Sequence, residues 1–215
     1  MNRIAVLLCA LALAACGGSS GGGGGGTTTH ETSAETVASS SSDFSGLAKC
    51  PESGTWDNYL KAEQTKDPSQ YASDKSDWDG LKAAGANDSY IAVYSASSSG
   101  CGSFGAAAPS GMVVNIYAIR FKDSASASDN FKTNSKTFHL SDSDLQNIQS
   151  AGGKVAQGDA TGLGTNSIAV SLSIAGTSFY IAFWQKNKFE VAMIAYNIPV
   201  ADAEAAAKKV NGRIP

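Results

Sequence analysis

The sequence predicts an α+β domain built as a two-layer sandwich, an antiparallel sheet with helices packed on one of its faces. Three runs rich in β-branched and aromatic residues, separated by short polar turns, lie at 168–174, 179–184 and 189–196. Consecutive strands with such short connections form an antiparallel meander. A strand followed by a helix occurs twice, at 113–121 with 124–135 and at 189–196 with 200–211. Helices placed in this way cover a sheet.

The first half of the domain supplies one helix and two strands. Thr55 can cap a helix that begins at Trp56, because its hydroxyl can accept hydrogen bonds from the first turn. The stretch that follows, up to Asn87, is polar and rich in turn-forming residues. Strands are then predicted at 90–94 and 112–121, joined by a loop of Gly, Ser and Ala.

The second half adds three helical segments to the meander. A helix is predicted over 124–138, with Ala127 and Phe131 facing inward at helical spacing. A short amphipathic segment follows at 140–149. The last helix covers 200–211 and closes the chain.

The N-terminus has the layout of a secretory signal over residues 1–15. Arg3 gives a positive start, and residues 4–13 form an apolar run that ends at a cysteine. An apolar helix of about a dozen residues is ~18 Å long, against a hydrocarbon core of ~30 Å. We therefore expect an export signal, not a permanent membrane span.

The residues that end this run, Leu13-Ala14-Ala15-Cys16, resemble the lipobox of bacterial lipoproteins. The resemblance implies that Cys16 takes a diacylglyceryl group, that cleavage precedes it, and that its new amine is acylated, for example with palmitate. The mature protein would then be lipid-anchored to the cell membrane or the outer membrane, on the extracytoplasmic side. The alternative is an ordinary secretory signal cut after Ala15, with Cys16 as a bystander.

Composition divides the rest of the chain into two parts. Residues 16–48 are dominated by Gly, Ser and Thr, with six consecutive glycines at 21–26. Such a segment buries too little apolar surface to offset the entropy of ordering it, so we expect a disordered linker after the lipidated cysteine. Residues 49–215 have the length of one α+β domain.

The cysteine count fits export to an oxidising compartment. Cys50 and Cys101 are the two cysteines within the predicted domain, so we expect them to form a disulfide. The alternative, a reactive or metal-binding pair, lacks both CxxC spacing and a nearby histidine.

Charge and motifs give no support to a nucleic-acid partner or to catalysis. The formal net charge is −3 and no basic stripe is present, which excludes the usual footprint of nucleic-acid binding. The chain has no GxSxG, HExxH, CxxC or P-loop motif. We therefore expect no enzymatic activity, no cofactor and no metal site.

Two features resemble parts of functional sites, but each has a simpler structural interpretation. His139 is the only histidine of the predicted domain; we expect it on the surface or at a helix end, with a catalytic or pH-sensing role as the alternative. Asp77 and Asp79 precede Gly80 as in a calcium loop, but the twelfth position would be Ala86 where a bidentate Glu is needed. We expect a solvated turn there.

The order of elements at the end of the chain carries a second resemblance. Gly162-Leu163-Gly164 leads into the strands and an Ala-rich helix closes the domain, an order similar to the PsbP-like α/β sandwich of some actinobacterial lipoproteins and sensor domains. That family shares a fold and no catalytic residues, so the resemblance implies binding or assembly roles only.

Two strands are apolar on both faces, which suggests a binding surface. If Phe183 and Val191 face the helices, Trp184 and Tyr196 point outward, and Arg120 would recognise an anionic group beside them. The alternative is that the Cys101 loop or the Trp56 helix covers this face.

The sequence therefore predicts a non-catalytic extracytoplasmic lipoprotein that binds the membrane through Cys16 and binds a small apolar ligand or an envelope protein. An envelope hydrolase and a structural spacer are the alternatives.

Overall fold

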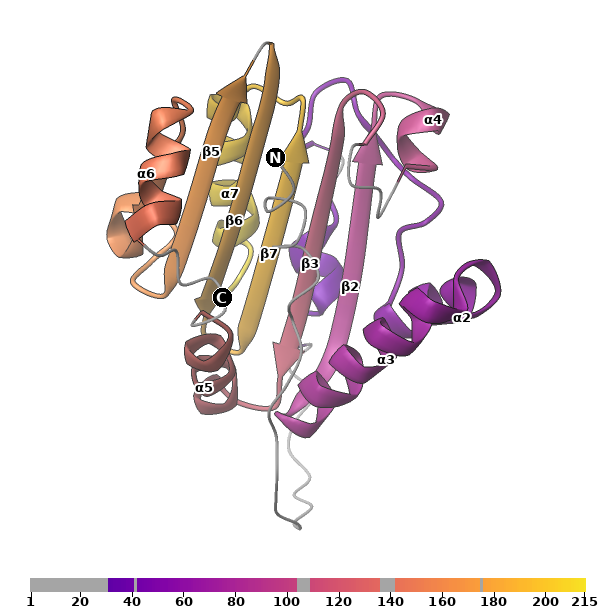
Figure 1. Cartoon of the computed structure of the whole chain (residues 1–215). Helices are drawn as coiled ribbons and strands as arrows, with labels where there is room; N and C mark the ends of the chain where they lie inside the picture. Colours follow the sequence, from indigo (N-terminus) through magenta and orange to yellow (C-terminus); the bar gives the residue numbers. More distant parts are fainter. Residues whose placement is uncertain (1–30, 41, 104–108, 136–141, 175) are drawn as a thin grey trace.

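The computed structural model describes residues 31–40, 42–103, 109–135, 142–174 and 176–215 (Figure 1). Its centre is a seven-stranded, fully antiparallel sheet in the order β1-β2-β3-β7-β6-β5-β4. Together with the helices this sheet confirms the predicted α+β class. Among these ranges, no helix is both long and apolar enough to cross a bilayer.

The strands match the predicted meander and extend it by one. Their bounds are β1 Ala48–Lys49, β2 Ala86–Ser95, β3 Val113–Phe121, β4 Lys154–Gln157, β5 Ser167–Ile174, β6 Thr177–Lys186 and β7 Phe189–Tyr196. Strands β4 to β7 are consecutive neighbours, as short connections require. Strand β4 was not predicted, because four residues are too few to show a period.

The helices include one that was predicted as a turn-rich segment. Their bounds are α1 Ala34–Ala38, α2 Trp56–Lys66, α3 Pro68–Ala83, α4 Ser98–Cys101, α5 Ser124–Ser135, α6 Asp142–Ser150 and α7 Val200–Gly212. Asp67 caps α3 by accepting hydrogen bonds from the backbone N–H groups of Ser69 and Gln70, and Pro68 occupies the first turn. An acidic cap followed by proline is a helix start signal, so the turn prediction was wrong.

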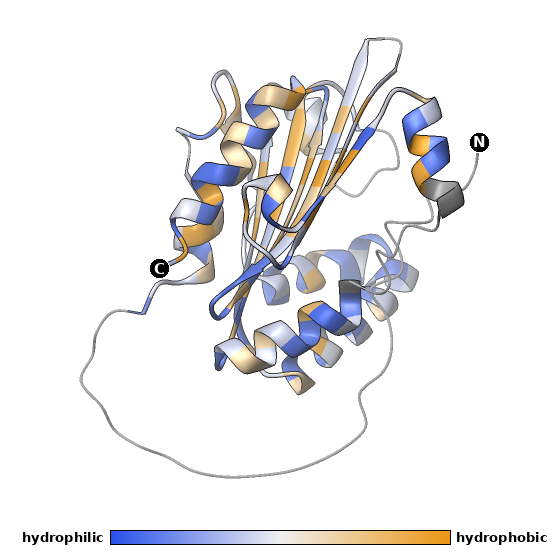
Figure 2. Ribbon diagram, turned by 90° about the vertical axis from the view of Figure 1, so that its left-hand side faces the viewer, coloured by the Kyte–Doolittle hydropathy of each residue, from blue (hydrophilic) through white to orange (hydrophobic). Residues whose placement is uncertain are grey.

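Helices cover both faces of the sheet, where the sequence predicted one (Figure 2). Helices α1 and α7 lie on the face to which β6 points Tyr180, Ala182 and Trp184, which we call the α7 face. Helices α2, α3 and α5 lie on the opposite face, the α3 face, to which β6 points Phe179, Ile181 and Phe183. Helices lie on both faces because strands that are apolar on both sides must be covered on both sides.

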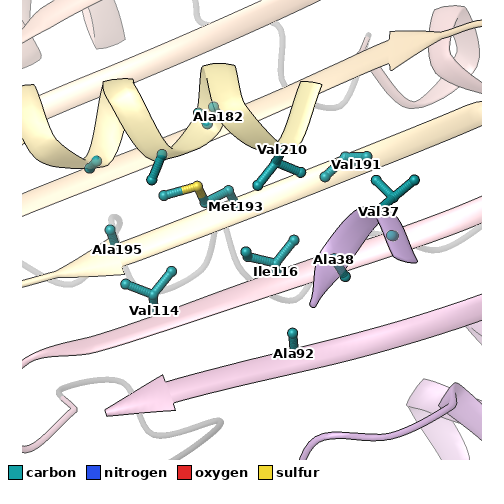
Figure 3. Packing of buried hydrophobic residues seen from close by; sticks show 14 of the residues in the cluster. Val37, Ala38, Ala92, Val114, Ile116, Ala182, Val191, Met193, Ala195 and Val210 are labelled. Carbon is teal, nitrogen blue, oxygen red and sulfur yellow. The ribbon is translucent and has the colours of Figure 1, made fainter. Parts of the chain in front are cut away.

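The α7 face holds the main core (Figure 3). Along β7, Val191, Met193 and Ala195 are fully buried against small side chains of α7. The alanines let the helix axis come close to the sheet, which explains why an Ala-rich helix closes the chain. Burial of this kind contributes about 25 cal/mol for each Å² of apolar surface removed from water.

The fold begins well before the predicted boundary at residue 49. Helix α1 buries Ala34, Val37 and Ala38 completely in the core of the α7 face (Figure 3). The Asp88 carboxylate accepts a hydrogen bond of 2.8 Å from the backbone N–H of Ala34. This pairs one of the N–H groups that the first turn of α1 leaves without an intrahelical partner. Residues 31–48, except 41, therefore belong to the folded unit and not to a disordered linker. Composition misled the prediction because small residues are also what a close helix–sheet contact needs.

The core of the α3 face is smaller and lies over β2 and β3. Trp56 of α2 and Trp78 of α3 stack with ring centroids 5.7 Å apart and cover the inner strands. The predicted disulfide is confirmed: Cys50 and Cys101 are joined, with their Cα atoms 5.6 Å apart. It links the end of β1 to α4.

Candidate functional site

Trp184 lies in the core and not on a binding surface. It pairs with Val191 across β6 and β7, and directly paired residues of antiparallel strands share a face. Val191 faces α7, so Trp184 does too, and its exposed fraction is 0%. The prediction that Trp184 points outward was wrong, because it placed Phe183 and Val191 on one face although Phe183 pairs with Ala192.

Arg120 is also on the α7 face, where it belongs to a network of charges at the start of the fold. Its guanidinium contacts the carboxylate of Glu31 at 3.0 Å and that of Asp88 at 3.9 Å. Lys188 donates to the same Glu31 carboxylate at 2.9 Å, and these two cations hold the pKa of Glu31 below its usual range. The predicted anion-recognising role is therefore not supported: Arg120 shares no face with Tyr196 and already has two acidic partners.

Tyr196 does lie on the α3 face, where the structure places a continuous group of half-buried apolar side chains. Tyr196 is paired with Phe179, and both are partly exposed. We define the open strip as the half-buried apolar residues that β5, β6 and β7 present on this face: Ile168, Val170, Leu172, Phe179, Ile181, Ala192, Ile194 and Tyr196.

Helices flank the open strip without covering it. Helices α2 and α3 lie over β2 and β3, whereas α6 runs beside β4 at the other edge of the sheet (Figure 1). Helix α5 covers the end of the strip, where Phe131 stacks on Phe183 with centroids 4.8 Å apart. Among the described residues, the Trp56 helix and α4, which ends at Cys101, thus cover only the β2 and β3 part of this face and leave the strip open.

Asn115 borders the strip and was not predicted as a site residue. It lies on β3 between Val93 and Ile194, its cross-strand partners on β2 and β7. Its exposed fraction is only 8%, yet its side-chain Oδ1 has no hydrogen-bond partner within the described ranges. A polar side chain at Asn115, in the otherwise apolar first part of Val113–Phe121, was the signal that sequence reasoning overlooked.

Beyond the strip, under α5, lies a buried acid. Glu190 is 2% exposed, and both of its carboxylate oxygens lie 3.0 Å from Nδ2 of Asn130. Burial raises the pKa of Glu190 to about 8, and the hydrogen bond from Asn130 offsets only part of this effect. The carboxyl is therefore mostly protonated at neutral pH and joins α5 to β7.

A shallow hollow of about 330 Å³ lies between α2 and α3, and several of the polar groups that line it pair with one another. Lys75 and Lys82 both pair with Asp79, and the Trp78 Nε1–H donates to Asp57 at 2.9 Å. The predicted solvated turn is part of helix α3. Burial raises the pKa of Asp77, on this helix, to about 6.

The remaining predicted positions divide between the disulfide and the undescribed residues. Cys50 and Cys101 lie near Glu52 in an arrangement with metal-ligand geometry, but both sulfurs are used in the disulfide and so supply no thiolate. Cys16 and His139 lie outside the described residues.

The comparisons with known proteins include a distant likeness to a solved structure. No protein-family model matches the chain, and no curated protein matches it. Among solved structures, the extracellular domain of PknH from Mycobacterium tuberculosis is similar, with a TM-score of 0.39 and 15% identity, over 63% of this chain and 69% of that one. A likeness of this size carries no argument about function, which must come from the site itself.

Proposed function

We propose that the chain is an extracytoplasmic, lipid-anchored domain without catalytic activity that binds an apolar ligand or envelope partner through the open strip. The observation that carries the proposal is the asymmetry of β6 and β7. The side chains that these strands present beneath α7 are buried, whereas most of those on the α3 face are half-exposed and still apolar.

An apolar surface left open on a folded domain lowers stability compared with a covered one, at about 25 cal/mol for each Å². Contiguous apolar patches of a few hundred Å² on soluble domains commonly mark interaction sites. The strip is continuous across three adjacent strands and is flanked by helices, so it is a defined surface and not a set of scattered residues.

A lipid anchor at Cys16 fits an envelope location, because it would hold the domain on the extracytoplasmic side of a membrane. The Cys50–Cys101 disulfide fits the oxidising conditions outside the cytoplasm. We expect Cys16→Ser to release the protein from membranes or to leave it as an uncleaved precursor. Entry of labelled palmitate into this variant would contradict the anchor.

Nile red, a neutral apolar dye, tests the binding surface directly. We expect saturable Nile red fluorescence with the wild-type domain and its loss in Ile181→Asp, which places a charge in the middle of the strip. Ala201→Asp, on the exposed side of α7, is the matched control and should bind as the wild type does. Circular dichroism shows whether each variant is folded. Equal dye binding by both folded variants would refute the strip as the binding surface.

A further inference from the structure

At the border of the open strip lies a polar group, the side-chain oxygen of Asn115, that has no partner in the described part of the chain. Asn115 Oδ1 is buried, and no described residue donates a hydrogen bond to it. A buried acceptor of this kind destabilises the fold, because it has lost its hydrogen bonds to water. Retaining it in a strand that is otherwise suited to apolar residues points to a donor that arrives from outside the chain.

Asn115 is aligned with residues of the open strip across the sheet. Asn115 lies in one cross-strand row with Ile194, Ile181 and Val170, all on the α3 face. Strands are about 4.8 Å apart, so this row runs for about 14 Å from the orphan acceptor across the apolar surface. A ligand that follows the row would meet a hydrogen-bond acceptor at one end and only apolar side chains beyond it.

The size and charge of the strip restrict what can occupy it. All eight of its side chains are half-buried, whereas a stable protein interface needs about 800 Å² of exposed surface on each partner. On the α3 face of β5, β6 and β7, Glu190 is the only side chain of the described residues with a carboxyl or amino group, and α5 buries it. The strip therefore suits a narrow, uncharged ligand better than a second protein or a charged lipid.

We propose that the open strip binds a neutral amphiphile, with its alkyl chain on Ile181 and Ile194 and a hydroxyl or amide N–H donating a hydrogen bond to Asn115 Oδ1. This assignment rests on the proposed function and adds the ligand class. The ligand keeps its single polar contact at the β3 border, and its apolar body completes the cover of the sheet that the helices leave open.

A matched pair of probes tests the assignment: 1-dodecanol, which has a hydroxyl donor, and dodecyl methyl ether, which has none. Both are measured by displacement of Nile red from the wild-type domain. One uncharged hydrogen bond predicts about fivefold to tenfold tighter binding of the alcohol. Asn115→Leu should remove this preference, so that the alcohol and the ether bind with equal affinity.

The same variant has a second, structural readout. Because Leu removes an unpaired buried acceptor, Asn115→Leu should raise the thermal midpoint, and Asn115→Val gives a second test with a residue favoured in strands. A lower midpoint for both variants would show that the Asn115 side chain has a partner within the fold, and would overturn the proposal.

The outcomes separate this inference from the function on which it rests. If both probes bind equally and Ile181→Asp abolishes both, the strip binds apolar ligands but Asn115 does not select among them. If neither probe displaces the dye, or Ile181→Asp has no effect, the binding function itself is contradicted. Preference for the alcohol in the wild type, lost in Asn115→Leu, supports both.

Discussion

The buried Glu190 gives this domain a specific pH dependence of stability. The folded state holds the proton on this carboxyl up to about pH 8, whereas an unfolded glutamate loses it near 4.5. Between these values unfolding releases a proton, so the free energy of unfolding falls as pH rises, and it levels off above the folded pKa. Glu190→Gln removes the titration and can keep an oxygen that accepts from Asn130.

The size of the effect follows from the two pKa values. Each pKa unit corresponds to about 1.4 kcal/mol, so Glu190→Gln should exceed the wild type in stability by about 3 kcal/mol at pH 7 and by at most about 5 kcal/mol above pH 8. Near pH 4.5 the two proteins should differ little. Asp77, whose pKa is also raised, is present in both proteins and so does not contribute to their difference.

Urea denaturation at pH 5, 6, 7 and 8 measures this difference. Glu204→Gln, at an exposed position of α7, is the matched control and should follow the wild-type curve. Parallel pH profiles for the wild type and Glu190→Gln would show that Glu190 is already ionised in the folded protein, and would refute the reasoning.

Three further predictions concern the core, the disulfide and the start of the fold. Trp184→Ala should lower the free energy of unfolding by about 3 to 5 kcal/mol, because it leaves a cavity at a fully buried site. A folded variant of unchanged stability would show that Trp184 is not part of the core. Replacing both Cys50 and Cys101 by Ser should cost about 4 kcal/mol for a loop of this length, measured by urea denaturation, and no change would mean that the reduced chain is already constrained. A chain that begins at residue 49 should unfold at a lower temperature than one that begins at residue 31, because it lacks α1; equal midpoints would place α1 outside the cooperative unit.

Local signals in the sequence were sufficient for most of the elements. Strand β7 and helices α2 and α7 begin or end within a residue or two of their predicted limits, because a clear period and a cap or breaker mark them. Helix α3 was missed although Asp67 and Pro68 mark its start, since the polar residues along it obscured the apolar positions Trp78 and Leu81. Helix α1 has a cap residue in Ser33, but its five residues are too few to show a period, and a helix of this length is not stable without tertiary contacts.

The candidate site was only partly predictable. That the strands around Phe179 and Val191 are apolar on both faces is visible in their composition, and in the structure their apolar side chains on the α3 face are half-buried. Which side chains belong to it depends on register: Tyr196 is on the strip, whereas Trp184 and Arg120 are on the other face. A period of two assigns alternate residues to opposite faces but does not say which face a helix covers.

The sequence by itself determined the α+β class, the meander, the closing helix and the pairing of the two cysteines of the domain, because these depend on local periodicity, short turns and a count of thiols. The tertiary structure decided that helices lie on both faces, that residues near 34 enter the core, and that Asn115 Oδ1 is buried with no hydrogen-bond partner among the described residues. These features depend on which segments meet across the sheet, and such contacts between distant residues arise only when the whole chain packs.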